Sequence, residues 1–340
     1  MNRPALLAVD GGGSKIDAAL LRRDGTVLGA RRVAADEYQH TGDDAFFAQI
    51  DRAVAAACAD AGRDLDDAPV ADVGIFCLAG ADLPLDDRRI NEGLARRRWV
   101  NEHVLRNDTF AVLRAGTDRN WGVGIVCGFG TNCTGVSPEG RVYRLPAIGP
   151  VSGDWGGASE LGGAALWHAI RAGDGRDRRT SLQRSVPAHF HLRTARQVME
   201  ALYTGRLDED RLAELAPTVF AEAAADDAVA TALVERQADE IVLMATAAIR
   251  KLRMQQLDPD VVLGGGIFRN EWAPFFERIE AGLHAVAPAA RIVLLAAPPV
   301  VGAAMLGLDV LGATRAAHAR TRAGLTHARL ATQTRARKER

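Results

Sequence analysis

The sequence predicts an α/β fold made of two copies of one lobe. The chain has 340 residues, more than a single hydrophobic core usually serves. Residues 6–28 hold two short apolar runs around three consecutive glycines, followed by an Asp-Gly turn and a third run, which is typical of a β-meander. Residues 126–143 repeat this form with a second glycine turn and a Glu-Gly turn. The repeat indicates two related lobes.

After the meander, the first copy continues with alternating helix and strand patterns. Residues 43–62 place apolar side chains at helical spacing and end at a glycine. The other predicted elements of this copy are a strand over 70–78, a helix over 86–98, a strand over 103–106 and a helix over 109–115. The predicted order is therefore β-β-β-α-β-α-β-α.

The second copy repeats this order from residue 123, with a long insertion. A glycine-rich loop is expected over 149–163. Helices are predicted over 164–172, 194–203, 210–224, 228–256 and 301–311, and strands over 261–263 and 291–295.

These patterns predict an N-terminal lobe over 1–118 and a C-terminal lobe with a helical insertion over 119–312. The remaining segment, 313–340, holds eight Lys and Arg residues against one acid. We expect it to form a basic helix or tail, solvated, frayed or packed back on the N-terminal lobe, in preference to a nucleic-acid arm.

Composition excludes several classes of function. Hydrophobic residues make up 48% of the chain, charged residues 25%, and the formal net charge is −1. These values describe an ordinary globular protein without a nucleic-acid or membrane partner. The N-terminus leads into the first strand without a signal-peptide core, so we expect a cytoplasmic protein. Four cysteines without CxxC spacing are expected to be buried reduced thiols: Cys58, Cys77, Cys127 and Cys133.

The first glycine turn suggests a polyphosphate site. Gly11, Gly12 and Gly13 can adopt backbone angles closed to other residues, so their N–H groups can converge on an anion. Asp10 would repel an anion directly but can serve one through a divalent cation. A glycine-rich hairpin with an exposed aspartate is the alternative.

The second turn matches the first residue by residue. Gly128 corresponds to Gly11, Gly130 to Gly13 and Thr131 to Ser14, while Cys127 stands where the first copy has Asp10. Two phosphate turns that share one metal-directed carboxylate suit a nucleotide held between two lobes.

Four further segments carry a family resemblance: LAGAD at 78–82, RNDTFAVLRAG at 106–116, GFGTNC at 128–133 and SGDWGG at 152–157. With them, residues 6–311 resemble the N-acetylglucosamine kinase branch of the BadF/BadG/BcrA/BcrD ATPase family, in the superfamily of sugar kinases, actin and heat-shock ATPases. The resemblance implies duplicated actin-like ATPase (ribonuclease H-like) lobes with an interlobe cleft. It also implies ATP-dependent phosphorylation of the 6-hydroxyl of an amino sugar, with N-acetylglucosamine as the expected acceptor and glucosamine, N-acetylmuramic acid and glucose as alternatives.

Roles for the nucleotide-binding residues follow from this resemblance. Asp10 would hold Mg²⁺, and the N–H groups of both turns would cradle the β- and γ-phosphates of ATP. Lys15 would add positive charge or remain a solvated lysine. The residues expected to contact the nucleotide are Gly11, Gly12, Gly13, Ser14, Lys15, Gly128, Gly130, Thr131, Gly264, Gly265, Gly266 and Asn270.

Asp108 is the expected general base for the sugar hydroxyl. It stands where a strand ends and a helix begins, so the helix N-terminus is expected to lower its pKa and keep it ionised. The alternative is a helix N-cap without catalytic function.

The sugar is expected to contact a second group of residues. Asp154 would accept two sugar hydroxyls, and Trp155 would stack on the ring or anchor its loop in the core; the family often has Glu at this position. The full expected set is Gly80, Asp82, Asn107, Asp108, Asn132, Asp154 and Trp155. We also expect a homodimer.

Two other functions stay open at this stage. A dehydratase-activator ATPase shares the predicted fold but needs exposed cysteines for an iron–sulfur cluster. A non-catalytic sugar sensor would need a helix-turn-helix ahead of the first strand, which already starts by Leu6.

Overall fold

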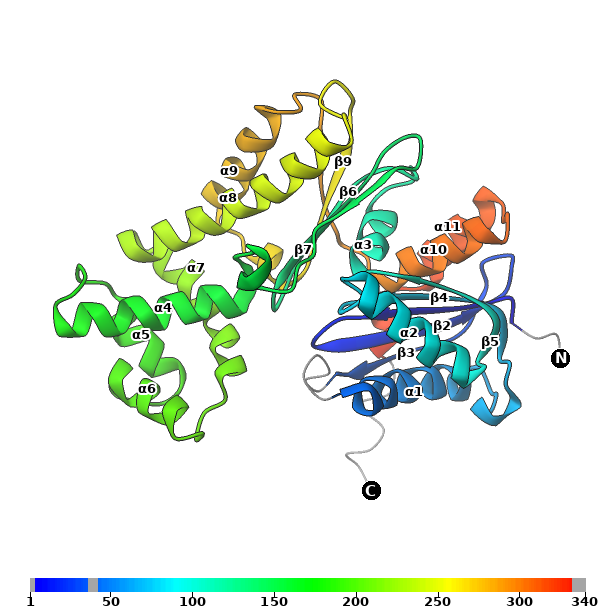
Figure 1. The fold of residues 1–340 in the computed structure, drawn as a ribbon, viewed down its shortest axis with the longest axis horizontal. Helices are drawn as coiled ribbons and strands as arrows, with labels where there is room; N and C mark the ends of the chain where they lie inside the picture. Colours follow the sequence, from blue (N-terminus) through cyan, green and yellow to red (C-terminus); the bar gives the residue numbers. More distant parts are fainter. Residues whose placement is uncertain (1–3, 36–41, 332–340) are drawn as a thin grey trace. The chain divides into compact units, whose positions relative to one another are not determined.

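The protein is described here from a computed structural model, which describes residues 4–35 and 42–331 (Figure 1). The chain divides into two compact units, one formed by residues 1–124 together with 293–340, the other by 125–292. The first break lies near the predicted boundary at 119. The second differs from the prediction, because residues 293–312 pack with the N-terminal unit.

A five-stranded mixed sheet forms the centre of the N-terminal unit. Its strands, in the spatial order β3-β2-β1-β4-β5, are β1 (Leu6–Gly11), β2 (Lys15–Leu21), β3 (Val27–Ala34), β4 (Ala71–Leu78) and β5 (Val100–Arg106). Strand β1 pairs antiparallel with β2 and parallel with β4, which in turn pairs parallel with β5. The carboxyl ends of β1, β4 and β5 therefore meet at one edge of the sheet.

Helices cover both faces of this sheet. One face packs on α1 (Gly42–Asp60) and α2 (Pro84–Arg97). The other packs on α3 (Asp108–Gly116), α10 (Val300–Val310), α11 (Arg315–Gly324) and α12 (His327–Ala331). Successive residues of β1 alternate between the two cores, as expected for a strand buried on both faces.

The C-terminal unit repeats the sheet of the N-terminal unit. Its strands, in the order β10-β9-β6-β7-β8, are β6 (Gly122–Cys127), β7 (Thr131–Val136), β8 (Val142–Arg144), β9 (Asp260–Gly264) and β10 (Arg291–Leu294). If β6, β7, β8, β9 and β10 are matched in turn to β1, β2, β3, β4 and β5, each strand has the same neighbours in both sheets. The predicted duplication is confirmed.

The helical insertion follows β8. It holds α4 (Gly157–Asp174), α5 (Leu182–His189), α6 (Ala195–Tyr203), α7 (Ala216–Ala224) and α8 (Ala228–Lys251), and α9 (Ala273–His284) follows β9. Helix α4 starts earlier than predicted, within the expected glycine-rich loop. Helices α5 and α9 were not predicted.

The C-terminal helices pack against the N-terminal unit, beside its strands in Figure 1. Thr321 of α11 donates a hydrogen bond to the carbonyl oxygen of Gly25, and Leu330 of α12 is buried. Of the predicted arrangements for this segment, packing back on the N-terminal lobe describes residues 315–331. Residues 332–340 lie outside the described part of the chain.

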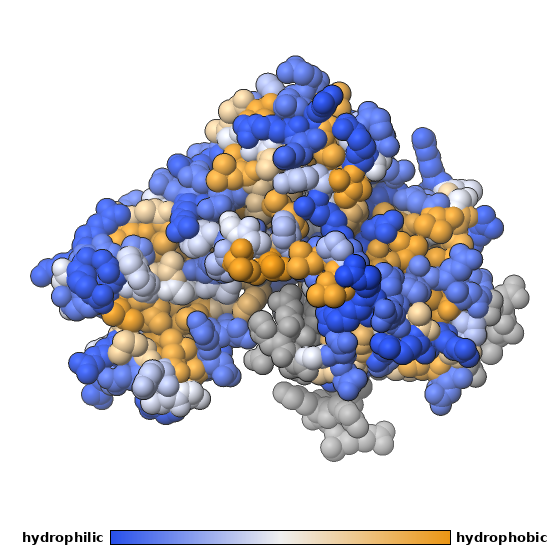
Figure 2. All heavy atoms as spheres, in the orientation of Figure 1, coloured by the Kyte–Doolittle hydropathy of each residue, from blue (hydrophilic) through white to orange (hydrophobic). Residues whose placement is uncertain are grey.

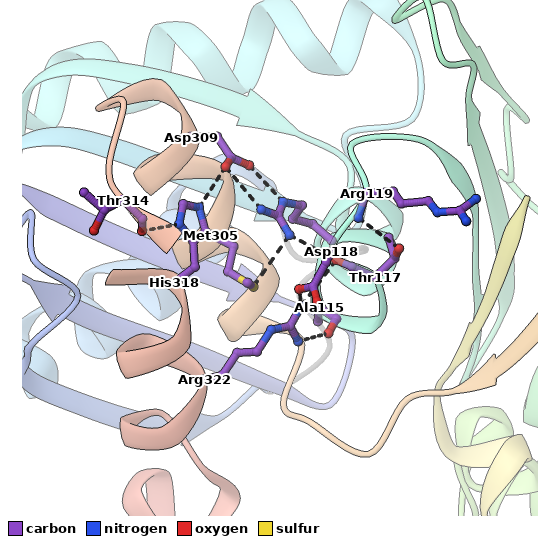
Figure 3. A network of polar contacts seen from close by, with 10 residues as sticks. Ala115, Thr117, Asp118, Arg119, Met305, Asp309, Thr314, His318 and Arg322 are labelled. Atoms are coloured by element: carbon purple, nitrogen blue, oxygen red, sulfur yellow. Dashed lines mark hydrogen bonds and ion pairs between the residues drawn. The ribbon is translucent and has the colours of Figure 1, made fainter. Parts of the chain in front are cut away.

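A polar network joins these helices to α3 (Figure 3). Both carboxylate oxygens of Asp309 bind Arg114, at 2.8 and 3.2 Å, and His318 lies 2.8 Å from the same carboxylate. Arg322 bonds the carbonyl oxygens of Ala115 and Thr117 at the end of α3. The network fixes the C-terminal end of the helix that begins with Asp108.

Asp309→Ala is expected to destabilise the protein by about 2–3 kcal/mol, because it leaves a guanidinium that is only 8% exposed without its anion. Asp309 is 31% exposed, so the loss stays below that expected for a fully buried pair. Urea unfolding would measure it. Asp118→Ala is the matched control, because Asp118 is 91% exposed and its ion pair with Arg322 should contribute less than about 0.5 kcal/mol.

The surface has the mixed character of ordinary globular proteins. The face shown in Figure 2 is largely hydrophilic, with smaller hydrophobic areas between the polar ones. Within residues 4–35 and 42–331, none of the helices has the length and apolar content that crossing a membrane would require.

Candidate functional site

Asp10 lies at the carboxyl end of β1 and is only 5% exposed. No hydrogen bond reaches its carboxylate from the described residues. Burial raises its pKa well above the usual value, and the nearby charge of Asp17 adds to the effect. Lys15 opposes this rise, while Asp108 contributes to it. Asp10 and Asp108 are therefore near neighbours in one unit.

Asp17 forms the centre of an ion cluster behind Asp10. It is fully buried, pairs with Asp10 across β1 and β2, and binds Arg32 through two bonds of 2.6 Å. The Lys15 ammonium lies 3.7 Å from Asp17 and is 28% exposed. Lys15 is thus paired with a carboxylate, which neither sequence-based interpretation anticipated.

Asp108 is the first residue of α3, and Asn107 is the N-cap. The N-cap interpretation of Asp108 is therefore wrong. The predicted direction of its pKa shift is also wrong, because burial raises the pKa of Asp108 to about 7. The N–H groups of Thr109 and Asp108 act in the predicted direction but are outweighed. A carboxyl group with this pKa can accept a proton near neutral pH.

Asn107 has a structural role in this unit. Its Oδ1 accepts hydrogen bonds from the backbone N–H and the hydroxyl of Thr109, and its Nδ2 donates to Asp82 at 2.8 Å. The side chain is buried. It joins the loop after β4, which includes Gly80 and Asp82, to the start of α3. These predicted residues meet at the same sheet edge as Asp10.

The first glycine turn is close-packed on one side and open on the other. A Cβ on Gly11 would lie 2.8 Å from Leu78, whereas one on Gly13 would meet nothing within 4 Å. The N–H of Gly12 donates to the carbonyl oxygen of Lys15. None of the three has a positive φ, so the predicted conformational reason for these glycines is wrong. The amides of Gly13 and Ser14 remain without hydrogen-bond partners among the described residues.

In the C-terminal unit, the second glycine turn rests on the start of α4. The carbonyl oxygens of Gly128 and Phe129 accept hydrogen bonds from Ala158 and Ser159, at 2.8 and 3.0 Å. Gly157 has φ +84°, and a Cβ there would lie 2.5 Å from the Phe129 carbonyl oxygen. Open space adjoins the turn, because a Cβ on Gly128 or Gly130 would meet nothing within 4 Å.

Thr131 and Asn132 make local contacts. The Thr131 hydroxyl donates to the Val126 carbonyl oxygen at 3.3 Å, and Asn132 Oδ1 accepts the N–H of Cys133 at 2.7 Å. Both side chains are partly exposed.

Asp154 and Trp155 lie in the loop before α4, and both are partly exposed. The Ser152 hydroxyl donates to the Asp154 carboxylate. The Arg236 guanidinium of α8 lies 4.0 Å from the centre of the Trp155 ring. One ring face of Trp155 is therefore used within the protein, which favours the interpretation of Trp155 as a loop anchor.

The third glycine segment follows β9. Gly265 has φ +117°, and a Cβ there would lie 2.2 Å from the Cys127 carbonyl oxygen at the end of β6. Position 265 therefore requires glycine. A Cβ on Gly266 would meet nothing within 4 Å. Asn270 donates to the Ile267 carbonyl oxygen and accepts the Trp272 N–H, so both ends of its amide serve the local turn.

The residues at the first glycine turn fit a magnesium-bound polyphosphate. In the described part of the chain, no three His, Cys, Asp or Glu side chains form a group that could hold a metal ion. Mg²⁺ needs no such group when phosphates and water supply most of its ligands. Asp10 is a buried carboxylate that accepts no hydrogen bond from the described residues, and with the nearby open backbone amides it provides the chemistry that such an ion requires.

Two sheets of identical topology, each with a glycine turn after its first strand, define the chain as a duplicated actin-like ATPase fold. Residues 7–307 match the BadF/BadG/BcrA/BcrD ATPase family, and the chain belongs to it. Membership in a family of ATPases implies use of ATP.

Two curated relatives extend over most of the chain. An N-acetyl-D-glucosamine kinase of Dictyostelium discoideum is 25% identical over 324 residues, covering 91% of this chain and 99% of the relative. An N-acetylmuramic acid/N-acetylglucosamine kinase of Clostridium acetobutylicum is 22% identical, covering 78% of this chain and 86% of the relative.

Solved structures share the fold. One from Chromobacterium violaceum, provisionally designated an N-acetylglucosamine kinase, has a TM-score of 0.69 at 23% identity and covers 90% of this chain and 99% of its own. A ROK family glucokinase from Streptomyces griseus in complex with glucose and AMPPNP has a TM-score of 0.52 at 18% identity, covering 88% and 98%.

Proposed function

We propose that this protein transfers the γ-phosphoryl group of ATP to the 6-hydroxyl of an amino sugar. The observation that carries the proposal is the pair Asp10 and Asp108, two buried carboxyl groups that meet at one sheet edge beside a glycine turn. Phosphoryl transfer needs positioning, charge neutralisation and a base for the acceptor, and little covalent help from the protein.

The two carboxyl groups, Asp10 and Asp108, would have different roles. Asp10 would hold Mg²⁺, directly or through water, and the ion would neutralise charge on the phosphates. The open amides of Gly13 and Ser14 would donate to phosphate oxygens on the N-terminal unit. The amides of the second turn are proposed as the phosphate-binding segment of the C-terminal unit. Asp108, with a pKa of about 7, would accept the proton of the sugar hydroxyl as it attacks.

The acceptor is proposed to be N-acetylglucosamine, because both curated relatives carry that substrate in their names. Glucosamine, N-acetylmuramic acid and glucose are the alternatives. Asp154 and Asn132 are the proposed sugar-binding residues of the C-terminal unit, and Gly80 and Asp82 those of the N-terminal unit. Asn270 and Asn107 are proposed as supports, since their side chains are committed to neighbouring groups.

An iron–sulfur activator is disfavoured by the cysteines. The structure buries Cys58, Cys77, Cys127 and Cys133, while a cluster needs accessible thiolates. Burial also raises the pKa values of these thiols, which opposes thiolate formation.

A coupled ADP-release assay with Mg-ATP and each of the four sugars tests the proposal. We expect turnover to be highest with N-acetylglucosamine. Without sugar, ADP release should be slow, because water competes as a phosphoryl acceptor and enzymes of this kind gain from suppressing it. ADP release that no sugar stimulates would refute the kinase assignment.

A further inference from the structure

Gln237 of α8 is a buried polar residue on the mostly apolar face of the helix. It is 0% exposed, and its neighbours Val234, Ala238 and Ile241 on the same helix are buried too. Its Oε1 accepts the Gly157 N–H at 2.8 Å. Its Nε2 has no hydrogen-bond partner among the residues that the structure describes, and a Cβ on Gly156 would lie 2.8 Å from that nitrogen. A buried, half-satisfied amide costs stability, so its presence requires an explanation.

The hydrogen bond between Gln237 and Gly157 links α8 to the start of α4. Gly157 is the first residue of α4, and the next two amides of the helix hold the carbonyl oxygens of Gly128 and Phe129. Gln237 therefore binds the first N–H of α4. The glycine turn packs against this same end of the helix. The three consecutive amides at the start of α4 are all bonded, one to α8 and two to the glycine turn.

The orientation of the glycine turn follows from peptide geometry. In a trans peptide, the carbonyl oxygen of one residue and the N–H of the next point in opposite directions. Because the carbonyl oxygens of Gly128 and Phe129 face α4, the N–H groups of Phe129 and Gly130 face away from it. Open space adjoins this part of the turn, because a Cβ on Gly130 would meet no atom within 4 Å.

We propose that Gln237 is a positioning residue for nucleotide binding, acting through α4 on the amides of Phe129 and Gly130. The inference rests on the proposed function in one respect, that this turn receives the phosphates of the nucleotide. Gln237 does not touch the nucleotide. It holds the start of α4 in the one position that turns both amides outward together.

Gln237→Met tests the proposal, since methionine has a similar size and removes only the polar groups. We expect the Kd for MgADP, measured by isothermal titration calorimetry without sugar, to rise about tenfold, equivalent to the loss of one well-placed hydrogen bond. Protection of the peptide containing Phe129 and Gly130 from hydrogen exchange on MgADP binding should fall in parallel. Unchanged affinity and protection would overturn the proposal.

Thr246→Val is the matched control. Thr246 is also a buried polar residue of α8, and its hydroxyl donates to the Leu243 carbonyl oxygen of the same helix. We expect this variant to lose stability while the Kd for MgADP stays within about twofold of the wild-type value. A tenfold rise in both variants would mean that damage to α8 alone weakens binding.

Gly157→Ala approaches the same turn independently if Gln237→Met does not fold. The new Cβ would lie 2.5 Å from the Phe129 carbonyl oxygen and displace the turn, so the same rise in Kd is expected. Wild-type protein that binds MgADP but phosphorylates none of the sugars would refute the sugar assignment and leave this inference intact. If the wild type phosphorylates a sugar but the Kd for MgADP is unchanged in both Gln237→Met and Gly157→Ala, this inference is refuted. The proposed function then still stands.

Discussion

Asp108→Asn is expected to lower kcat by on the order of 10² to 10⁴ while binding of ATP and sugar stays nearly intact. Asparagine matches aspartate in size and suits the first turn of α3, but its amide cannot take the proton of the sugar hydroxyl. Steady-state kinetics with the preferred sugar would measure the loss. Turnover close to that of the wild type would remove Asp108 from the mechanism.

The pH dependence gives this prediction a second readout. Asp108 has a pKa of about 7, so wild-type kcat/KM should rise with pH through about 7 as the base loses its proton. Asp108→Asn should lack that rise. Asp44→Asn is the control, because Asp44 is an exposed aspartate in the first turn of α1. Its replacement changes the charge at a helix start and should leave the pH profile unchanged.

The Asp108→Asn variant should lose activity but gain stability. The pKa of Asp108 is raised above the unfolded value of about 3.8, so the folded protein binds this proton more tightly than the unfolded chain. The resulting stabilisation is complete below about pH 4 and is lost as pH rises towards 7. Asp108→Asn should therefore gain stability relative to the wild type between pH 4 and 8. A gain limited to acidic pH would contradict the assigned pKa.

The repeated lobe could be predicted from sequence because each copy carries its own local signals. Apolar runs, glycine turns and Asp-Gly or Glu-Gly turns are read within about twenty residues. The assignment of residues 293–312 depends on long-range packing instead. A Cβ on Gly302 of α10 would lie 1.8 Å from the Ala111 carbonyl oxygen of α3, a contact between residues far apart in the sequence.

The residues proposed for the site remain a prediction, but the structure corrects two of the reasons given for them. Gly11, Gly12 and Gly13 were expected to supply unusual backbone angles, but none has a positive φ, and Gly13 leaves open space where a side chain would stand. The pKa of Asp108 was misjudged because its burial depends on tertiary packing, which outweighs the visible effect of a helix start. The roles of Gln237 and Asp17 depend on pairing across elements and have no sequence signature.

Asp10→Asn is expected to lower kcat/KM by on the order of 10² to 10⁴ and to abolish the preference for MgADP over free ADP. Burial and the charge of Asp17 raise the pKa of Asp10, so an ionised Asp10 is costly in the protein without a cation. A divalent ion would offset that cost, whereas the neutral amide of asparagine avoids it.

Which protein has the higher Tm, the wild type or Asp10→Asn, should therefore depend on the conditions. At pH 8 in EDTA, Asp10→Asn should have a higher Tm than the wild type, because the buried charge is gone. With Mg²⁺ and ADP, the wild type should gain more in Tm, because only it keeps the carboxylate proposed to bind the ion. Thermal unfolding under both conditions, with calorimetric titration of ADP with and without Mg²⁺, measures both effects. Equal gains from Mg²⁺ in the two proteins would mean that Asp10 is buried for structural reasons and that the metal has other ligands.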